Sequence, residues 1–251
     1  MRTKFWACAA GCILLATSLM AQQQKKLTRK EITAFQEIQQ ATTIDSRIAA
    51  AEKFVTSFAD SPLRSVALDL AAQAAQQKGN SPQAVSYAQS ALDMDAKDYD
   101  AMLLISGELA RGTHENDLDK DEKLARSEKL ANDAIVAIQA STKPFWASAT
   151  EEQWNGVKKD RIAQAHEDLG LIALARKKPD VAVTEFKEAV DGASQPDPAT
   201  MVRLAAAYDQ AGKPADAIAT LDKVLAMPNV NAVVKQFATA ERNRAVAATK
   251  K

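Results

Sequence analysis

Residues 204–218 read LAAAYDQAGKPADAI, and residues 169–183 read LGLIALARKKPDVAV. Both stretches start with leucine and a small residue, and both continue into a second run of small and bulky apolar residues. The matched pairs are Leu169 with Leu204, Gly170 with Ala205, Ala182 with Ala217, Phe186 with Leu221, Ala189 with Val224, and Val190 with Leu225. Each pair is 35 residues apart. A constant offset of this size indicates an internal structural repeat.

A third copy lies earlier in the chain and keeps the same internal spacing. It contains Leu68, Ala72, Gly79, Ala84, Ala88, Ala91 and Leu92. Small residues at fixed places let two helices approach closely, while the bulky residues fill the groove around them. Gly79 and Gly212 end a first helix, and the proline after each opens a second. One such hairpin cannot bury its apolar face alone, so we expect neighbouring hairpins to stack into a solenoid.

These residues resemble the tetratricopeptide repeat (TPR) family, whose pattern has an early Leu-Gly pair, a central alanine, then an aromatic residue and another alanine. The resemblance implies an all-α, right-handed α-solenoid of about five helix-turn-helix repeats with a C-terminal capping helix at 232–248. The predicted repeats are 28–62, 65–98, 99–141, 163–196 and 198–231, within a domain spanning 22–248. Two insertions, at 112–122 and 142–162, interrupt the repeat period. If function is local, we expect it at these interruptions.

The first insertion is rich in acidic residues. Its alternating carboxylates resemble a calcium-binding EF-hand loop, with candidate ligands at Asp117, Asp119, Asp121 and Glu128. However, Glu122 occupies the place where that loop needs glycine for its sharp turn. The alternative is a solvated loop whose Asp residues cap the next helix.

The second insertion contains Trp146 and Trp154. Exposed aromatic side chains there could form a pocket for a peptide or a sugar. The favoured alternative is that they fold back and cover the joint left by the late start of the fourth repeat.

The TPR resemblance also implies a concave surface that is lined by the first helix of each repeat. The candidate partner-binding residues on it are Asp69, Gln73, Gln76, Gln77, Leu103, Arg111, Glu167, Leu171, Asp209 and Gln210. Family members that grip the C-terminal carboxylates of chaperones present Lys, Asn and Arg on this surface. Asp69, Gln73 and Glu167 stand there instead, so the sequence disfavours such a carboxylate clamp.

The N-terminus has the pattern of a secretory signal peptide, with Arg2 and Lys4 before an apolar run over 5–21 and a polar stretch after it. We predict cleavage after Ala21, which makes the protein periplasmic or secreted. A retained membrane anchor is the alternative, as is lipidation at Cys12, where residues 9–12 loosely resemble a lipobox. Cleavage would remove both cysteines, Cys8 and Cys12.

The remaining ~230 residues carry 30 Lys and Arg against 32 Asp and Glu, without a basic stripe. This balance predicts no nucleic-acid binding, and contact with a membrane only through an uncleaved or lipidated N-terminus. Neither His114 nor His166 has Ser or Asp neighbours at the spacing of a catalytic triad, and no phosphate-binding loop is present. The sequence therefore predicts a non-enzymatic scaffold without a cofactor, which binds a partner protein or peptide. An envelope-tethered structural subunit of an outer-membrane or secretion assembly is the alternative.

Overall fold

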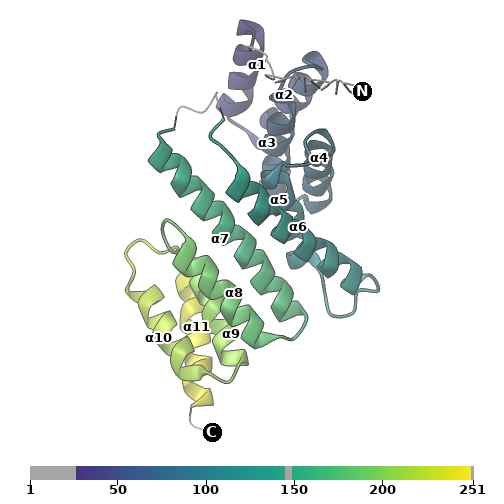
Figure 1. The fold of residues 1–251 in the computed structure, drawn as a ribbon. Coiled ribbons are helices and arrows are strands. Elements are labelled where there is room, and N and C mark those ends of the chain that lie inside the picture. The colour runs from purple at the N-terminus through teal and green to yellow at the C-terminus, as the bar shows by residue number, and fades with distance from the viewer. Residues whose placement is uncertain (1–26, 145–148, 250–251) are drawn as a thin grey trace, which may run out of the picture.

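The computed structural model describes residues 27–144 and 149–249, and these residues are helical with short connections. The helices are α1 (Arg29–Gln40), α2 (Ile44–Ser57), α3 (Arg64–Gln77), α4 (Ser81–Met94), α5 (Tyr99–Gly112), α6 (Lys120–Ala140), α7 (Glu151–Ala175), α8 (Pro179–Gly192), α9 (Pro198–Gln210), α10 (Pro214–Ala226) and α11 (Ala232–Ala248). Successive pairs form five antiparallel hairpins, α1–α2 to α9–α10, and α11 closes the stack. The hairpins follow one another from α1 at one end to α11 at the other (Figure 1).

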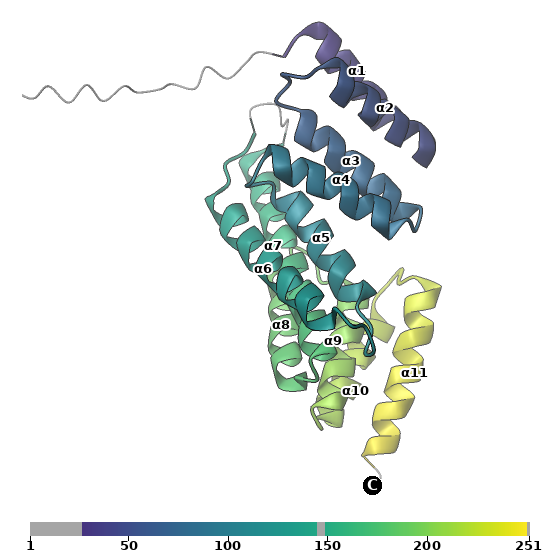
Figure 2. The same ribbon diagram turned by 90° about the vertical axis from the view of Figure 1, so that its right-hand side faces the viewer.

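Each helix packs chiefly on its neighbours in the chain. First helices of successive hairpins also touch, as α5 does with α7, and α9 touches the closing helix α11. The hydrophobic core is therefore a series of local clusters along the stack. One joins α1 to α3, another joins α7 to α9, and a third joins α9 to α11. Figure 2 shows the same order from the side, with α11 beside α9 and α10. This is the all-α, TPR-like solenoid that the repeat predicts.

The small residues of the repeat lie where helices approach most closely. Ala84, Ala182 and Ala217, at the same place in three second helices, are fully buried. The bulky Phe186 and Leu221 are also fully buried and fill the space beside them. The repeated pattern thus corresponds to the packing surface inside each hairpin.

Three hairpin turns share one backbone geometry. After α3, Gly79 has a φ of 76°, and the N–H of Asn80 donates to the carbonyl of Ala75. After α9, Gly212 has a φ of 71° and is followed by the equivalent bond from Lys213. This is the Schellman motif, which requires a left-handed residue after the helix. After α7 the same position is Lys177, with a φ of 58°, so one hairpin holds a non-glycine residue in a conformation that favours glycine.

The two interruptions differ in structure. Residues 113–119 form the loop between α5 and α6, within the first predicted insertion. The second is partly helical, because α7 begins at Glu151 and includes 151–162. The fourth hairpin therefore starts about three turns earlier than the repeat at 163–196 suggests. Within the described residues, no helix is both long and apolar enough to cross a membrane.

Candidate functional site: an inner groove

A polar cavity of about 250 Å³ lies between α3, α5 and α7. These are the first helices of three consecutive hairpins, so their inner faces line one continuous surface. The lining residues are Gln73, Gln76, Gln77, Asp100, Leu103, Leu104, Arg161 and Gln164. The cavity brings together four of the candidate partner-binding residues, Gln73, Gln76, Gln77 and Leu103. Leu103 forms part of its wall but is only 1% exposed.

Two further cavities continue this surface toward the C-terminus. The next, of about 240 Å³, lies between α7, α8 and α9, and shares Gln164 with the first. The third, of about 290 Å³, lies between α9 and α11. Glu167 lines the second and Arg203 the third, and their side chains form an ion pair of 2.9 Å. We call this row of three neighbouring cavities the inner groove.

Two arginines that line the inner groove, Arg161 and Arg203, and two on the same helices or on α11, Arg111 and Arg244, are already paired with carboxylates of the chain. Their pairs are Arg161 with Asp100 at 2.7 Å, Arg111 with Glu108 at 3.1 Å, Arg203 with Glu167 at 2.9 Å, and Arg244 with Asp209 at 3.1 Å. A partner's carboxylate would have to displace these internal anions. The charge arrangement therefore favours a ligand that is recognised through neutral polar groups.

Amide side chains supply such neutral groups. The Gln76 side chain donates to Glu108 at 2.7 Å, but the side-chain amides of Gln73 and Gln77 have no hydrogen-bond partner within 27–144 and 149–249. A glutamine amide can donate and accept at once, which matches the N–H and C=O of a peptide backbone. The wall between α3 and α7 is thus suited to main-chain recognition.

A cluster of buried carboxylates lies beside the first cavity. Asp69 on α3 is 7% exposed and lies within hydrogen-bonding reach of Asp98, the N-cap residue of α5. Burial, together with the charges of Asp98 and Asp100, raises the pKa of Asp69 to about 9. Asp69 is therefore protonated at neutral pH and can donate to Asp98. Because it is buried, Asp69 supports the wall of the groove and is not itself available to a partner.

Asp168 on α7 is a second buried carboxyl group, 1% exposed. Burial raises its pKa to about 7, although the Arg111 guanidinium, 3.9 Å away, acts in the opposite direction. Arg111 pairs with Glu108 of its own helix, α5, and also reaches Asp168 on α7. This candidate residue holds two first helices together.

The other candidate residues lie apart from the first cavity. Leu171 is half-buried and packs in the clusters around α7. Asp209 is tied to α11 through Arg244, and Gln210 is exposed at the end of α9. Trp154 is 9% exposed within α7, so the hypothesis of an exposed aromatic pocket is wrong for this residue. Trp146 lies outside the described residues.

The loop before α6 does not gather calcium ligands. Asp117 and Asp119 both pair with Lys123, at 3.3 and 2.9 Å, while Glu128 pairs with Arg176 at 2.7 Å. Asp121 lies in the first turn of α6. No group of three His, Cys, Asp or Glu side chains in the described chain is placed to hold a metal ion. The EF-hand hypothesis is therefore wrong. The Lys123 ammonium group pairs with two of the proposed calcium ligands, and Glu128 lies within helix α6, away from the loop.

Arg161 and Gln164 are groove residues that were not among the sequence candidates. Arg161 falls in the predicted insertion 142–162, and Gln164 is the second residue of the predicted fourth repeat. A local signal for the true start of α7 does exist. Thr150 and Gln153 form a capping box, in which each side chain bonds the backbone N–H of the other residue. A threonine three residues before a glutamine is the sequence signature of a helix start.

Comparison of the sequence with protein-family models and with curated proteins finds no match. Among solved structures, the fold is similar to TTC0263, a thermophilic TPR protein of Thermus thermophilus. That match has a TM-score of 0.55 and 15% identity over 89% of this chain and 97% of the other. It is also similar to the MamA protein, with a TM-score of 0.51 and 13% identity over 78% and 90% of the two chains. These likenesses support a TPR-like fold.

Proposed function

We propose that this protein is a non-catalytic scaffold that binds an extended segment of a partner protein along the inner groove. The observation that carries the proposal is the row of three cavities along α3, α5, α7, α9 and α11. The first two cavities share Gln164, and the Glu167–Arg203 ion pair lies between the second and the third. A solenoid presents such an extended surface without needing a deep pocket.

The groove's chemistry indicates how the segment is held. Gln73, Gln77 and Gln164 would bond main-chain amides, and the apolar wall of Val202, Val234 and Phe237 would receive a bulky side chain. The internally paired arginines make a terminal carboxylate a poor anchor. Recognition by a C-terminal carboxylate clamp is therefore not part of the proposal.

Site-specific photocrosslinking in cells tests the groove. A benzoylphenylalanine at Gln73 or Gln77 should capture the same partner, identified by mass spectrometry, whereas one at the exposed Glu188 of α8 should not. With that partner segment in hand, Gln73→Ala and Gln164→Ala should each weaken binding about threefold to tenfold, the effect of one or two hydrogen bonds. Equal capture from α3 and α8, or unchanged affinity in both variants, would contradict the proposal.

We further propose that the chain acts outside the cytoplasm after cleavage following Ala21, on the strength of the N-terminal pattern alone. Cell fractionation with N-terminal sequencing tests this. A mature chain that begins at Gln22 in the soluble envelope fraction would support cleavage. Recovery in membranes with residues 1–21 intact, or with a lipid on Cys12, would favour the tethered alternative.

A further inference from the structure

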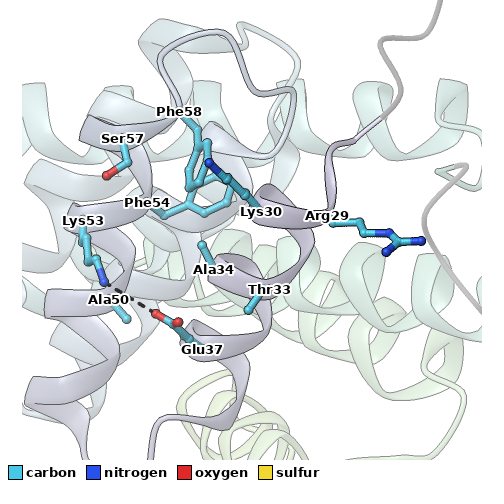
Figure 3. Close-up of a pocket in the computed structure, with 10 residues that line it drawn as sticks. All are labelled: Arg29, Lys30, Thr33, Ala34, Glu37, Ala50, Lys53, Phe54, Ser57 and Phe58. Carbon is cyan, nitrogen blue, oxygen red and sulfur yellow. Dashed lines mark ion pairs between the residues drawn. The ribbon is translucent and has the colours of Figure 1, made fainter.

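A second groove lies at the N-terminal end of the solenoid, between α1 and α2 (Figure 3). Its volume is about 360 Å³, and none of its lining residues belongs to the inner groove. We call it the terminal groove. The inference drawn from it does not depend on the function proposed for the inner groove.

The terminal groove is lined at regular helical spacing. On α1 the lining residues include Lys30, Thr33, Ala34 and Glu37. These are positions i, i+3, i+4 and i+7, which share one face of a helix. The trough therefore runs lengthwise along α1.

Helix α2 presents its side of the groove with the same spacing. Its lining residues include Ala50, Lys53, Phe54 and Ser57. Because both helices line the terminal groove with residues at i, i+3, i+4 and i+7, a third helix can bind between them, as in the helix-in-groove mode of recognition.

The floor of the terminal groove is apolar and well packed. The Phe54 ring is 1% exposed and lies 5.7 Å from Phe35, edge to face, and 5.0 Å from Phe58. Figure 3 shows Phe54, Phe58 and Ala34 between the two helices. The three packed aromatic rings hold this floor in place before any ligand binds. An apolar side chain can therefore dock on the floor without the entropic cost of ordering these rings.

The rim of the terminal groove is positively charged. Lys30 and Lys53 border it, with Arg29 at its edge and its side chain directed outward, against the single anion Glu37 (Figure 3). Lys53 and Glu37 are 3.8 Å apart and both well exposed, so their attraction is weak. Neither Arg29 nor Lys30 forms an ion pair with any residue of 27–144 or 149–249. The chain as a whole has zero net charge, so this local excess of positive charge favours an anionic ligand.

We propose that the terminal groove docks an amphipathic helix of a protein partner, with an apolar face bordered by Asp and Glu residues. A second copy of this chain fits less well. Among its exposed large apolar residues, only Val233 and Phe237 share one helix, α11, and α11 carries more basic than acidic residues. The others lie singly on other elements: Ile32, Met94, Leu118, Val136, Val157 and Val181. Docking α11 onto the terminal groove would bring like charges together.

A pair of designed peptides tests the proposal. Each is a fluorescein-labelled helix of about 18 residues with leucine at i, i+3, i+4 and i+7. One is bordered by glutamate, and in its twin every glutamate is replaced by lysine. Fluorescence anisotropy with the full chain at low salt should give a Kd about tenfold lower for the acidic peptide, and added salt should reduce the difference.

The double variant Lys30→Glu/Lys53→Glu changes two exposed side chains and should reverse the preference between the peptides. Thr33→Trp, which fills the trough, should weaken binding of the acidic peptide about tenfold or more. Lys223→Glu on the exposed face of α10 is the matched control and should leave the preference unchanged. Thermal melts followed by circular dichroism verify that each variant is folded.

Two results with the peptides would overturn the proposal. One is failure of both peptides to bind the wild-type chain, or equal binding of the two. The other is a preference that the double variant leaves unaltered. If sedimentation shows a dimer that the double variant dissociates, the occupant is a second copy and the assignment to a partner helix is wrong.

Discussion

Gly170 of α7 lies directly against the ring of Phe186 of α8, so closely that a methyl group on Gly170 would come within 2.7 Å of a ring carbon. Phe186 is fully buried and cannot move aside without disturbing the α8–α9 packing. The contact fixes how closely the two helices of the fourth hairpin approach. It explains why glycine follows Leu169 in this hairpin.

Gly170→Ala is therefore expected to destabilise the protein. Better helix propensity would contribute about 1 kcal/mol, but overpacking against Phe186 costs about 1–3 kcal/mol. We expect a net loss of about 1 kcal/mol, measured as a lower midpoint in urea denaturation.

The same helix provides the control. Gly156 lies in α7 with open space where its Cβ would be. Gly156→Ala should therefore gain about 1 kcal/mol from helix propensity alone. If Gly170→Ala and Gly156→Ala changed the free energy of unfolding in the same direction, the contact with Phe186 would not set the spacing of α7 and α8.

Lys177→Gly is expected to stabilise the fourth hairpin. Lys177 has a φ of 58° at the position that Gly79 and Gly212 occupy in equivalent turns, and a non-glycine residue there costs about 1 kcal/mol. The exposed pair between Lys177 and Glu115, 2.6 Å apart, contributes only about 0.5 kcal/mol. The expected net gain is a few tenths to about 1 kcal/mol, seen as a higher melting temperature.

Lys177→Ala separates these two effects, since it removes the ion pair but keeps a Cβ. It should be neutral or slightly destabilising. Gly212→Ala, the reverse change in the fifth hairpin, should lose about 1 kcal/mol. If Lys177→Ala stabilised as much as Lys177→Gly, the backbone conformation would not be the cause.

The fold was predictable from sequence because the solenoid is built from local contacts. Packing between neighbouring helices leaves a direct trace in the sequence. The traces are the 35-residue period, small residues such as Ala182 and Ala217, and Gly212 in the turn after α9. The start of α7 was not predictable from the period, because residues 151–162 extend a helix beyond the repeat. Only the capping box of Thr150 and Gln153 marks that start.

The groove was predictable only in part. Gln73, Gln76 and Gln77 follow from the family's concave face, since spacing along one helix determines which side chains share a face. Arg161 could not be assigned to the groove, because its place depends on how α7 packs across α5. The burial of Asp69 likewise depends on contacts between hairpins.

Arg161→Gln is expected to destabilise the junction of α3, α5 and α7. Arg161 lies 2.7 Å from Asp100, and its positive charge opposes the rise in the pKa of Asp69. Its removal leaves partly buried carboxylates without a counter-charge. We discount the cost of breaking a fully buried pair to about 1–3 kcal/mol, because both partners retain some exposure.

The loss of stability should be smaller in the double variant Arg161→Gln/Asp100→Asn, in which neither charge remains. A double-mutant cycle from urea denaturation measures this coupling. Strictly additive effects would show that the Arg161–Asp100 pair contributes nothing to stability.

Asp69→Asn should change how stability depends on pH. The pKa of Asp69 is raised from 3.8 to about 9 in the folded chain, so the folded state keeps a proton that the unfolded state releases above about pH 4. The stability contributed by this group is complete below about pH 4 and is lost progressively as pH rises toward 9. The slope is at most about 1.4 kcal/mol per pH unit.

Asparagine resembles the protonated acid and can still donate to Asp98, but it has no proton to lose. The variant should match the wild-type chain near pH 5 more closely than at pH 8, where it should be more stable by about 1 kcal/mol or more. Urea denaturation at a series of pH values measures this difference, with Asp216→Asn on the exposed face of α10 as control. Parallel curves for Asp69→Asn and wild type would show that Asp69 ionises in the folded state as it does in the unfolded chain.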